Sequence, residues 1–175
     1  MSTKDSVGSP RSDGETSAKV KATYQALLTS HQSATLATVS ADGSPLASYT
    51  PFAVDADMTF YIFISGLAQH TANLEHNPLA SLMLIADEAA TKQIFARPRL
   101  TFDCQASKLA RDSNAWQEAA SLYEARFSNF FKLIRDLQDF SMYKLIPLEG
   151  VLVAGFGQAF TVSGDKLDQL TLRRG

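Results

Sequence analysis

The sequence has little of what disulfide-bonded, zinc-binding and membrane-spanning proteins need. Cys104 is its single cysteine, which excludes an intrachain disulfide and a zinc site built on several thiolates. No apolar run approaches the ~20 residues that cross a bilayer, and the first ten residues lack the apolar core of a signal peptide. We therefore expect a cytoplasmic protein that does not enter a membrane.

A surplus of basic charge is also absent. The 16 Lys and Arg residues are outnumbered by 18 Asp and Glu residues, which argues against nucleic-acid binding, because phosphate binding needs a surplus of basic charge. A hydrophobic content of 45% in 175 residues is typical of one folded domain. Residues 1–17 are rich in Ser and Thr and nearly free of apolar side chains, so we expect a disordered tail there and a folded domain over residues 18–175.

The motifs of several enzyme classes are missing as well. There is no Gly-x-Ser-x-Gly nucleophile elbow and no Gly-x4-Gly-Lys phosphate loop. His70 and His76 are spaced so that a helix would turn their rings to different faces, which does not suit a zinc pair. The acidic residues are scattered over predicted helix faces and turns rather than paired. The sequence therefore predicts no metal site and no common hydrolytic site.

Hydrophobic periodicity predicts an α+β domain. Helical spacing indicates helices over residues 18–31, 67–77 and 113–127, the last continued to 137 by a second or kinked segment. Apolar alternation and short apolar runs indicate strands over 34–39, 45–54, 58–64, 80–86, 99–109, 140–146 and 151–162, before a last helical turn over 165–172. Gly155 and Gly157 indicate a bulge or tight bend in the last strand. Antiparallel strands that curl round remove their own edges, so we expect a small barrel.

Two groups of side chains suit a flat, anionic cofactor. Ser65, His70 and Thr71 lie where a strand gives way to a helix, and free backbone N–H groups at such a junction favour a phosphate or carboxylate. Arg97 and Arg99 enter the next long strand, and the guanidinium fork matches phosphate or carboxylate oxygens. A pair of surface arginines and an ordinary strand–helix junction would show the same residues, so this alternative stays open.

A third group lies on the second strand. Tyr49, Thr50 and Phe52 place hydroxyl groups beside aromatic surface, a combination that can hold a conjugated ring system.

The order of these pieces carries a family resemblance. The blocks are Ser-Ala-Thr-Leu-Ala-Thr-Val with Asp-Gly-x-Pro, Tyr49-Thr50-Pro51-Phe52, Ser65-Gly66-Leu67-Ala68 with His70-Thr71-x-Asn73-Leu74, Asn77-Pro78, Arg97-Pro98-Arg99-Leu100-Thr101, Asp139-Phe140-x-x-Tyr143-x-Leu145 and Gly155-Phe156-Gly157-Gln158-Ala159. Over residues 18–162 the sequence resembles the pyridoxamine-phosphate-oxidase-like FMN-binding split barrels. The later blocks resemble the haem-utilisation branch of that superfamily, which contains haem-binding and haem-degrading proteins.

The resemblance implies a six-stranded split barrel that forms a homodimer, with FMN or haem in two equivalent clefts between the protomers. It implies that the strand at Ser48, Tyr49 and Thr50, together with the junction from Ser65 to Thr71, approaches the cofactor. Arginines such as Arg97 and Arg99 would meet the FMN phosphate or the haem propionates.

For the haem branch, the resemblance implies that Asp139 has a catalytic role by supporting an axial histidine from the C-terminal tail, which favours activation of O2. Residues 167–175 contain no histidine, which departs from that pattern. Three functions follow from the resemblance: oxygen-dependent haem breakdown, an FMN-dependent oxidoreductase acting on a small molecule, and haem storage or delivery without catalysis.

Overall fold

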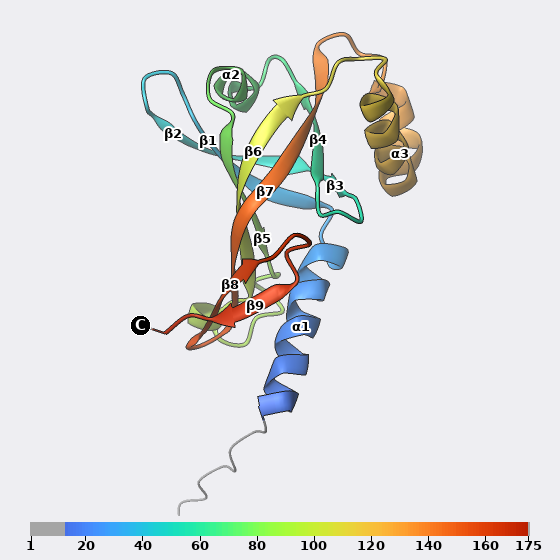
Figure 1. Cartoon of the computed structure of the whole chain (residues 1–175). Helices are drawn as coiled ribbons and strands as arrows, with labels where there is room; N and C mark the ends of the chain where they lie inside the picture. Colours follow the sequence, from blue (N-terminus) through green and yellow to red (C-terminus); the bar gives the residue numbers. More distant parts are fainter. Residues whose placement is uncertain (1–12, 175) are drawn as a thin grey trace, which may run out of the picture.

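The computed structural model describes residues 13–174 as a twisted, curled sheet with helices against its ends and one side (Figure 1). The helices are α1 (Asp13–Ser30), α2 (Gln69–His76) and α3 (Asn114–Ile134), with a 3-10 turn η1 (Ile94–Ala96). The strands are β1 (Ser33–Val39), β2 (Pro45–Pro51), β3 (Ala53–Val54), β4 (Phe60–Ser65), β5 (Leu79–Ile85), β6 (Arg99–Lys108), β7 (Phe140–Gly155), β8 (Gln158–Ser163) and β9 (Gln169–Leu172).

All paired strands in the described part of the chain are antiparallel. The order is β2-β1-β5-β6-β7-β4-β3, while β8 pairs with the far half of β7 and β9 pairs with β8. The two ends of this path, β2 and β3, are not joined by a strand ladder, so the barrel is split rather than closed. The predicted α+β split barrel is confirmed, with nine strands in the sheet in place of the six that the resemblance implied.

Strand β7 is continuous where the sequence indicated two strands separated by residues 147–150. Cys104 of β6 lies opposite Pro147, and Asp103 lies opposite Glu149, so Leu148 has no partner across the ladder. A bulge of this kind absorbs an extra residue without ending the strand. Proline lacks the N–H group that a regular ladder uses, and a bulge tolerates its absence.

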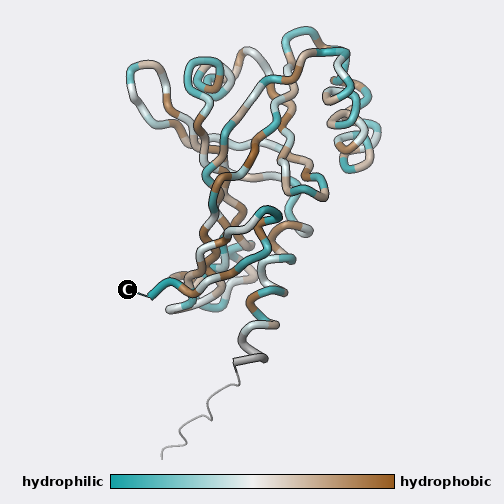
Figure 2. The backbone as a smooth tube through the Cα atoms, in the orientation of Figure 1, coloured by the Kyte–Doolittle hydropathy of each residue, from teal (hydrophilic) through white to brown (hydrophobic). Residues whose placement is uncertain are grey.

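The barrel interior is filled by aromatic and branched side chains from the central strands. The Phe60 ring lies between Phe52 and Phe102, with centroid distances of 5.4 and 5.5 Å. Helix α1 covers one end of this core with the face that its periodicity predicted, through Val20, Tyr24, Leu27 and Leu28, all of them buried. Hydrophobic stretches follow the strands of the sheet in Figure 2, as this packing requires.

A second, smaller core joins α3 to the sheet. Trp116, Tyr123 and Phe131 are buried against Phe63 and neighbouring residues of β4 and β7. The Tyr123 hydroxyl donates to the Pro51 carbonyl at 2.8 Å and accepts from the Phe63 N–H at 2.9 Å, so both of its polar functions are satisfied inside the core.

The structure differs from the predicted elements at both ends of the chain. Helix α1 begins at Asp13, so the predicted tail boundary at residue 17 lies inside a helix, and residues 1–12 of that tail lie outside the described residues. The last helical turn predicted over 165–172 is wrong, because Gln169–Leu172 forms β9. The glycine pair lies in the hairpin turn from β7 to β8, where the register shifts and Gly157 has φ +68°.

Gly150 is expected to tolerate no side chain. A Cβ there would lie 2.6 Å from Cδ1 of Phe102, its partner across the ladder, and 3.2 Å from the Thr101 carbonyl oxygen. Gly150→Ala should therefore lower the free energy of unfolding by about 1–3 kcal/mol in urea denaturation. Gly155→Ala, whose Cβ would meet only the movable Gln158 side chain, should change it by less than about 0.5 kcal/mol. Equal effects of the two substitutions would contradict this assignment.

Candidate cofactor site

The junction between β4 and α2 is held against the start of β7 by a short hydrogen-bond chain. Ser65 Oγ donates to Asp139 Oδ2 at 3.0 Å, and Thr71 Oγ1 donates to the Ser65 carbonyl at 2.6 Å. The Gly66 N–H donates to the Asp139 carbonyl at 2.5 Å, and a Cβ on Gly66 would lie 3.1 Å from that oxygen. The close approach explains a glycine at this position, which the sequence shows only as a strand breaker.

His70, on the first turn of α2, is oriented by β2. Its Nδ1 lies 3.0 Å from Ser48 Oγ, and that hydroxyl donates its single proton to the Leu36 carbonyl at 3.0 Å. Nδ1 must then be the donor toward Ser48, which leaves Nε2 with a lone pair that can accept a hydrogen bond. Because this bond joins β2 to α2, the predicted site residues Ser48, Ser65, His70, Thr71 and Asp139 form one contiguous group, here called the junction cluster.

Helix α2 itself is fixed by a residue to which the sequence analysis gave no role. The Asn73 side chain is buried, accepts from Gln69 Nε2 at 3.0 Å and donates to Thr38 Oγ1 at 2.9 Å. Asn73 belongs to one of the blocks of the family resemblance, and that was the only sequence signal that could have identified it.

Two of the predicted residues on β2 point in opposite directions. Tyr49 is 69% exposed, whereas Thr50 is 1% exposed and donates to the Pro51 carbonyl at 3.0 Å. Successive side chains of a strand alternate between its faces, so a ligand that lies on Tyr49 cannot also lie on Thr50. The structure therefore separates Thr50 from Tyr49.

The two predicted arginines lie at the other end of the sheet and differ in how they are bound. Arg97 donates through Nε to the Ala86 carbonyl at 2.7 Å and pairs with Glu88 at 2.9 Å. Arg99 donates only through Nη1 to the Arg97 carbonyl at 3.1 Å and has no carboxylate partner within the described residues. Of the two, Arg99 is the guanidinium that can accept a bidentate anion.

The sheet holds these arginines far from Ser65 and Asp139 of the junction cluster. Ser48 is nearer in register, because it lies opposite Leu36, which is paired through Leu82 with Phe102 of β6. Arg99 begins β6 and lies opposite Val153, while Lys108 ends β6 and lies opposite Tyr143, close to where β4 meets β7 at Ser65. At about 3.3 Å per residue, the length of β6 alone is roughly 30 Å. That length is greater than a porphyrin or a flavin ring system, so one ring along β6 would not reach both Arg99 and Asp139. In one copy of the chain, Ser65 and Asp139 thus lie near one end of β6 and Arg99 at the other (Figure 1), and the junction cluster and Arg99 are here called the two half-sites.

Two further observations on the described residues concern metal sites and membrane-spanning helices. Among residues 13–174, no group of three or more His, Cys, Asp or Glu side chains is arranged to hold a metal ion. No helix in that range is long and apolar enough to pass through a bilayer.

A split antiparallel barrel with polar side chains at the β4–α2 junction defines a class of proteins that includes flavin- and haem-binding members. Residues 20–154 match the family described as pyridoxamine 5'-phosphate oxidase, and the chain belongs to that family. Within it, the chain belongs to the haem-utilisation branch, because it is similar in sequence and structure to HutZ and in structure to ChuZ.

Two relatives and two solved structures give the scale of the similarity. The haem oxygenase HutZ of Vibrio cholerae is 47% identical over 132 residues, 75% of this chain and 74% of that protein. Its crystal structure, there described as that of a haem storage protein, has a TM-score of 0.70 at 38% identity and covers 73% of this chain and 89% of that chain. ChuZ of Campylobacter jejuni has a TM-score of 0.77 at 28% identity over 94% of this chain and 64% of that chain. The non-canonical chloroplastic haem oxygenase HOZ of Arabidopsis thaliana is 31% identical over 124 residues. These residues make up 71% of this chain and 36% of that protein.

The His70 imidazole is expected to stay neutral at pH 7. Burial lowers the pKa of His70 below its ordinary value of 6.5, because a buried ring loses the hydration of its charged form. In an NMR titration its ring protons should therefore shift with a midpoint below 6.5. A midpoint at or above 6.5 would contradict the buried, Ser48-bonded arrangement.

The same shift has a consequence for stability. The unfolded chain takes up a proton at its histidines near pH 6.5, and folded His70 takes it up only at lower pH. The free energy of unfolding should therefore fall as pH is lowered from about 6.5 through the pKa of folded His70. His70→Asn should show a shallower fall, with no difference in slope above about pH 7.

Proposed function

We propose that two copies of this chain bind haem in clefts between them, with the junction cluster of one copy facing the arginine end of the other. The separation of the two half-sites along β6 supports this most directly. Each half-site carries groups suited to the same ligand, and within one copy Arg99 lies at the opposite end of β6 from Ser65 and Asp139.

The two half-sites offer complementary chemistry. Arg99 has a guanidinium without a carboxylate partner in the described residues, which fits a haem propionate. In the junction cluster, His70 Nε2 can accept a hydrogen bond, and Asp139 has one carboxylate oxygen bonded to Ser65. The other oxygen of Asp139 can accept a further hydrogen bond from the ligand, because residues 167–175 contain no histidine that could take this position.

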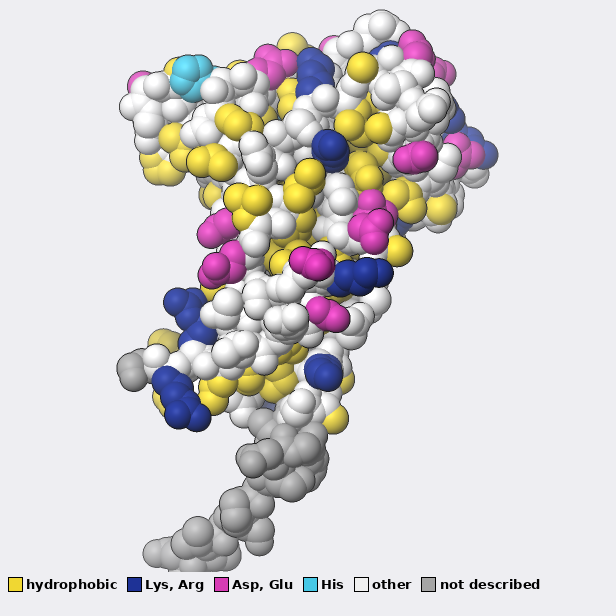
Figure 3. All heavy atoms as spheres, in the orientation of Figure 1, with side chains coloured by type: hydrophobic (Ala, Val, Ile, Leu, Met, Phe, Trp, Pro, Cys, Tyr) yellow, Lys and Arg dark blue, Asp and Glu magenta, His cyan; other side chains and the backbone are white. Residues whose placement is uncertain are grey.

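The outer surface of the sheet supports association of two copies. Tyr49, Leu79, Ile146 and Leu148 are large apolar or aromatic side chains, each at least 44% exposed. Leu79 and Leu148 also border a shallow groove of about 460 Å³ that is lined mainly by small and apolar residues. Hydrophobic side chains also lie along the middle of the face seen in Figure 3, over the strands. Exposed apolar surface around a groove such as the one that Leu79 and Leu148 border is typical of an interface.

We further propose that the bound haem is broken down with oxygen, because HutZ and HOZ are both named haem oxygenases. Bound haem would supply the redox chemistry, and this chain would supply position, charge and hydrogen bonds. Ascorbate added in air to the complex should then remove the Soret band and release iron. A Soret band that persists would instead favour haem storage, the role by which the HutZ crystal structure is described.

Arg99 and Arg97 form a matched pair for testing the cleft. Arg99→Ala should raise the Kd for haemin about ten-fold in a titration followed at the Soret band, because it removes a charge-assisted contact. Arg97→Ala removes the same group two residues away, where it is already bonded to Ala86 and Glu88, and should change the Kd by about two-fold or less.

An unchanged Kd in Arg99→Ala, or equal effects of the two substitutions, would remove Arg99 from the site. The spectrum of the purified protein provides a second control. Absorbance near ~450 nm from bound FMN, with no uptake of haemin, would favour the flavin-dependent oxidoreductase instead.

A further inference from the structure

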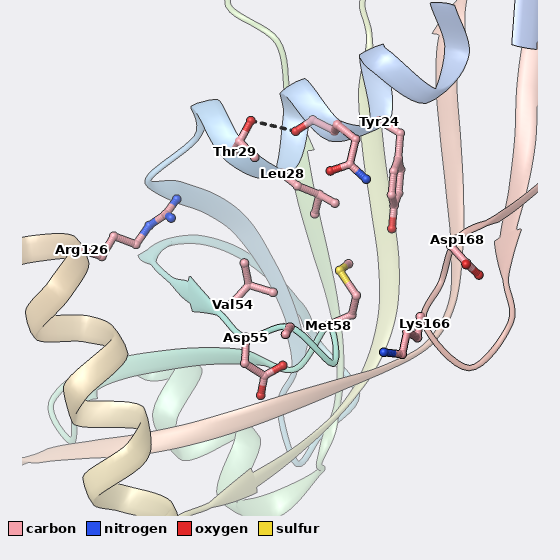
Figure 4. Close-up of a pocket in the computed structure, with 11 residues that line it drawn as sticks. Tyr24, Leu28, Thr29, Val54, Asp55, Met58, Arg126, Lys166 and Asp168 are labelled. Atoms are coloured by element: carbon pink, nitrogen blue, oxygen red, sulfur yellow. Dashed lines mark hydrogen bonds between the residues drawn. The ribbon is translucent and has the colours of Figure 1, made fainter. Parts of the chain in front are cut away.

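A separate cavity of about 490 Å³ lies beside the barrel, between α1, the β3–β4 turn, α3 and the loop that joins β8 to β9 (Figure 4). Its size is in the range of small-molecule sites. None of the predicted cofactor residues lines it. Elements far apart in the sequence meet here, and each contributes a different kind of side chain.

Arg126 of α3 borders the cavity as a cation without a counter-ion. Its Nη2 donates to the His31 carbonyl just after α1, and its guanidinium carbon lies 5.0 Å from the centre of the Phe52 ring. Its Nε is buried without a hydrogen-bond partner, and no carboxylate within the described residues forms an ion pair with it. Burial lowers the pKa of Arg126, which is the effect of a charge held partly out of water.

Among the described residues, neither acidic side chain that lines the cavity forms an ion pair with Arg126. The Asp55 carboxylate keeps its charge but is held away from Arg126 by three bonds, which it accepts from the Asp57 and Thr59 N–H groups and from the Tyr61 hydroxyl, each at 2.9 Å. Asp168 lies beside Lys166 at the opposite end of the cavity from Arg126 (Figure 4). The carboxyl end of α1 contributes about half a negative charge, which offsets only part of the guanidinium charge.

The middle of the cavity is apolar. Leu28 of α1, Val54 of β3 and Met58 of the following turn lie between Arg126 at one end and Lys166 at the other (Figure 4). A ligand that fits this arrangement has a carboxylate at one end and a hydrocarbon or aromatic body behind it. A small inorganic anion would leave the apolar part of the cavity filled with water.

We propose that this cavity is a second ligand site, which binds a small organic carboxylate with its anionic end on Arg126 and its apolar body on Leu28, Val54 and Met58. The site is independent of the haem cleft proposed above. Arg126 also holds the end of α1 through His31, and a purely structural role for that contact is the outcome that would overturn the proposal.

Octanoate is the probe, with acetate as its control, because the two share a carboxylate and differ in apolar body. Octanoate should give saturable 15N–1H NMR shifts at residues that line the cavity, and acetate should bind at least about ten-fold more weakly. Arg126→Gln should raise the Kd for octanoate about ten-fold, the effect of losing a charge-assisted hydrogen bond. Lys19→Gln, which removes the same charge from the exposed side of α1, should leave it unchanged.

A second variant tests the site without removing Arg126, in case Arg126→Gln does not fold. Gln25 is exposed on α1 and lines the cavity, so Gln25→Glu adds a competing carboxylate without disturbing the core. It should weaken octanoate binding while the Tm and the haemin Kd stay as in the parent protein. No saturable shift at millimolar octanoate, or equal binding of acetate and octanoate, would overturn the proposal. Failure of haem binding in the parent protein would leave this test unaffected.

Discussion

The antiparallel ladder between β6 and β7 is the constraint on which the rest of the structure depends. These two strands pair from Arg99 opposite Val153 to Lys108 opposite Tyr143, and each of the neighbouring strands β4, β5 and β8 adds to one of them. The ladder sets the length of the barrel and hence the distance between its two ends. Ser65 and Asp139 of the junction cluster lie near one end and Arg99 at the other, so the register of this pair decides which residues can share a ligand.

The filled interior of the barrel and the arrangement of the half-sites along β6 explain why haem binding would need two copies of the chain. A barrel of this size buries its core around Phe60 and has no internal space for a porphyrin. A planar pigment with acidic side groups would therefore lie on the outer surface. There, one copy places Arg99 and the Ser65–Asp139 pair at opposite ends of β6. A second copy placed against the apolar face of the sheet would shorten that separation and would exclude water from the ring.

Much of the fold could be predicted from the sequence, because strand alternation and helical spacing are local signals. The inward face of α1 and the run of strands from residue 34 to residue 109 follow directly from them. The segment Gln169–Leu172 could not be predicted in the same way. Its polar and apolar residues alternate, but four residues are too few to distinguish a strand from a helical turn, and pairing with β8 decides between them. The continuity of β7 was hidden for a related reason, because a bulge next to Pro147 resembles a break in the sequence.

The candidate site was predictable as a set of residues but not as an arrangement. The sequence places Arg97 and Arg99 two residues apart. Only the structure shows that Glu88 forms an ion pair with Arg97, and that Arg99 has no carboxylate partner among the described residues. Thr50 and Tyr49 are neighbours in the chain and lie on opposite faces of β2. The distance between the half-sites depends on register and strand length, which no single motif contains.

The most direct test is complementation between two defective chains. One chain carries Arg99→Ala, and the other carries His70→Ala with Asp139→Ala, so each homodimer has two damaged clefts. Co-expressed and purified as mixed dimers, the two chains should regain one intact cleft and bind about half the haem of the parent dimer at the parent affinity. Mixed dimers that bind no more haem than either homodimer would contradict the account, because the two half-sites would then not belong to one cleft.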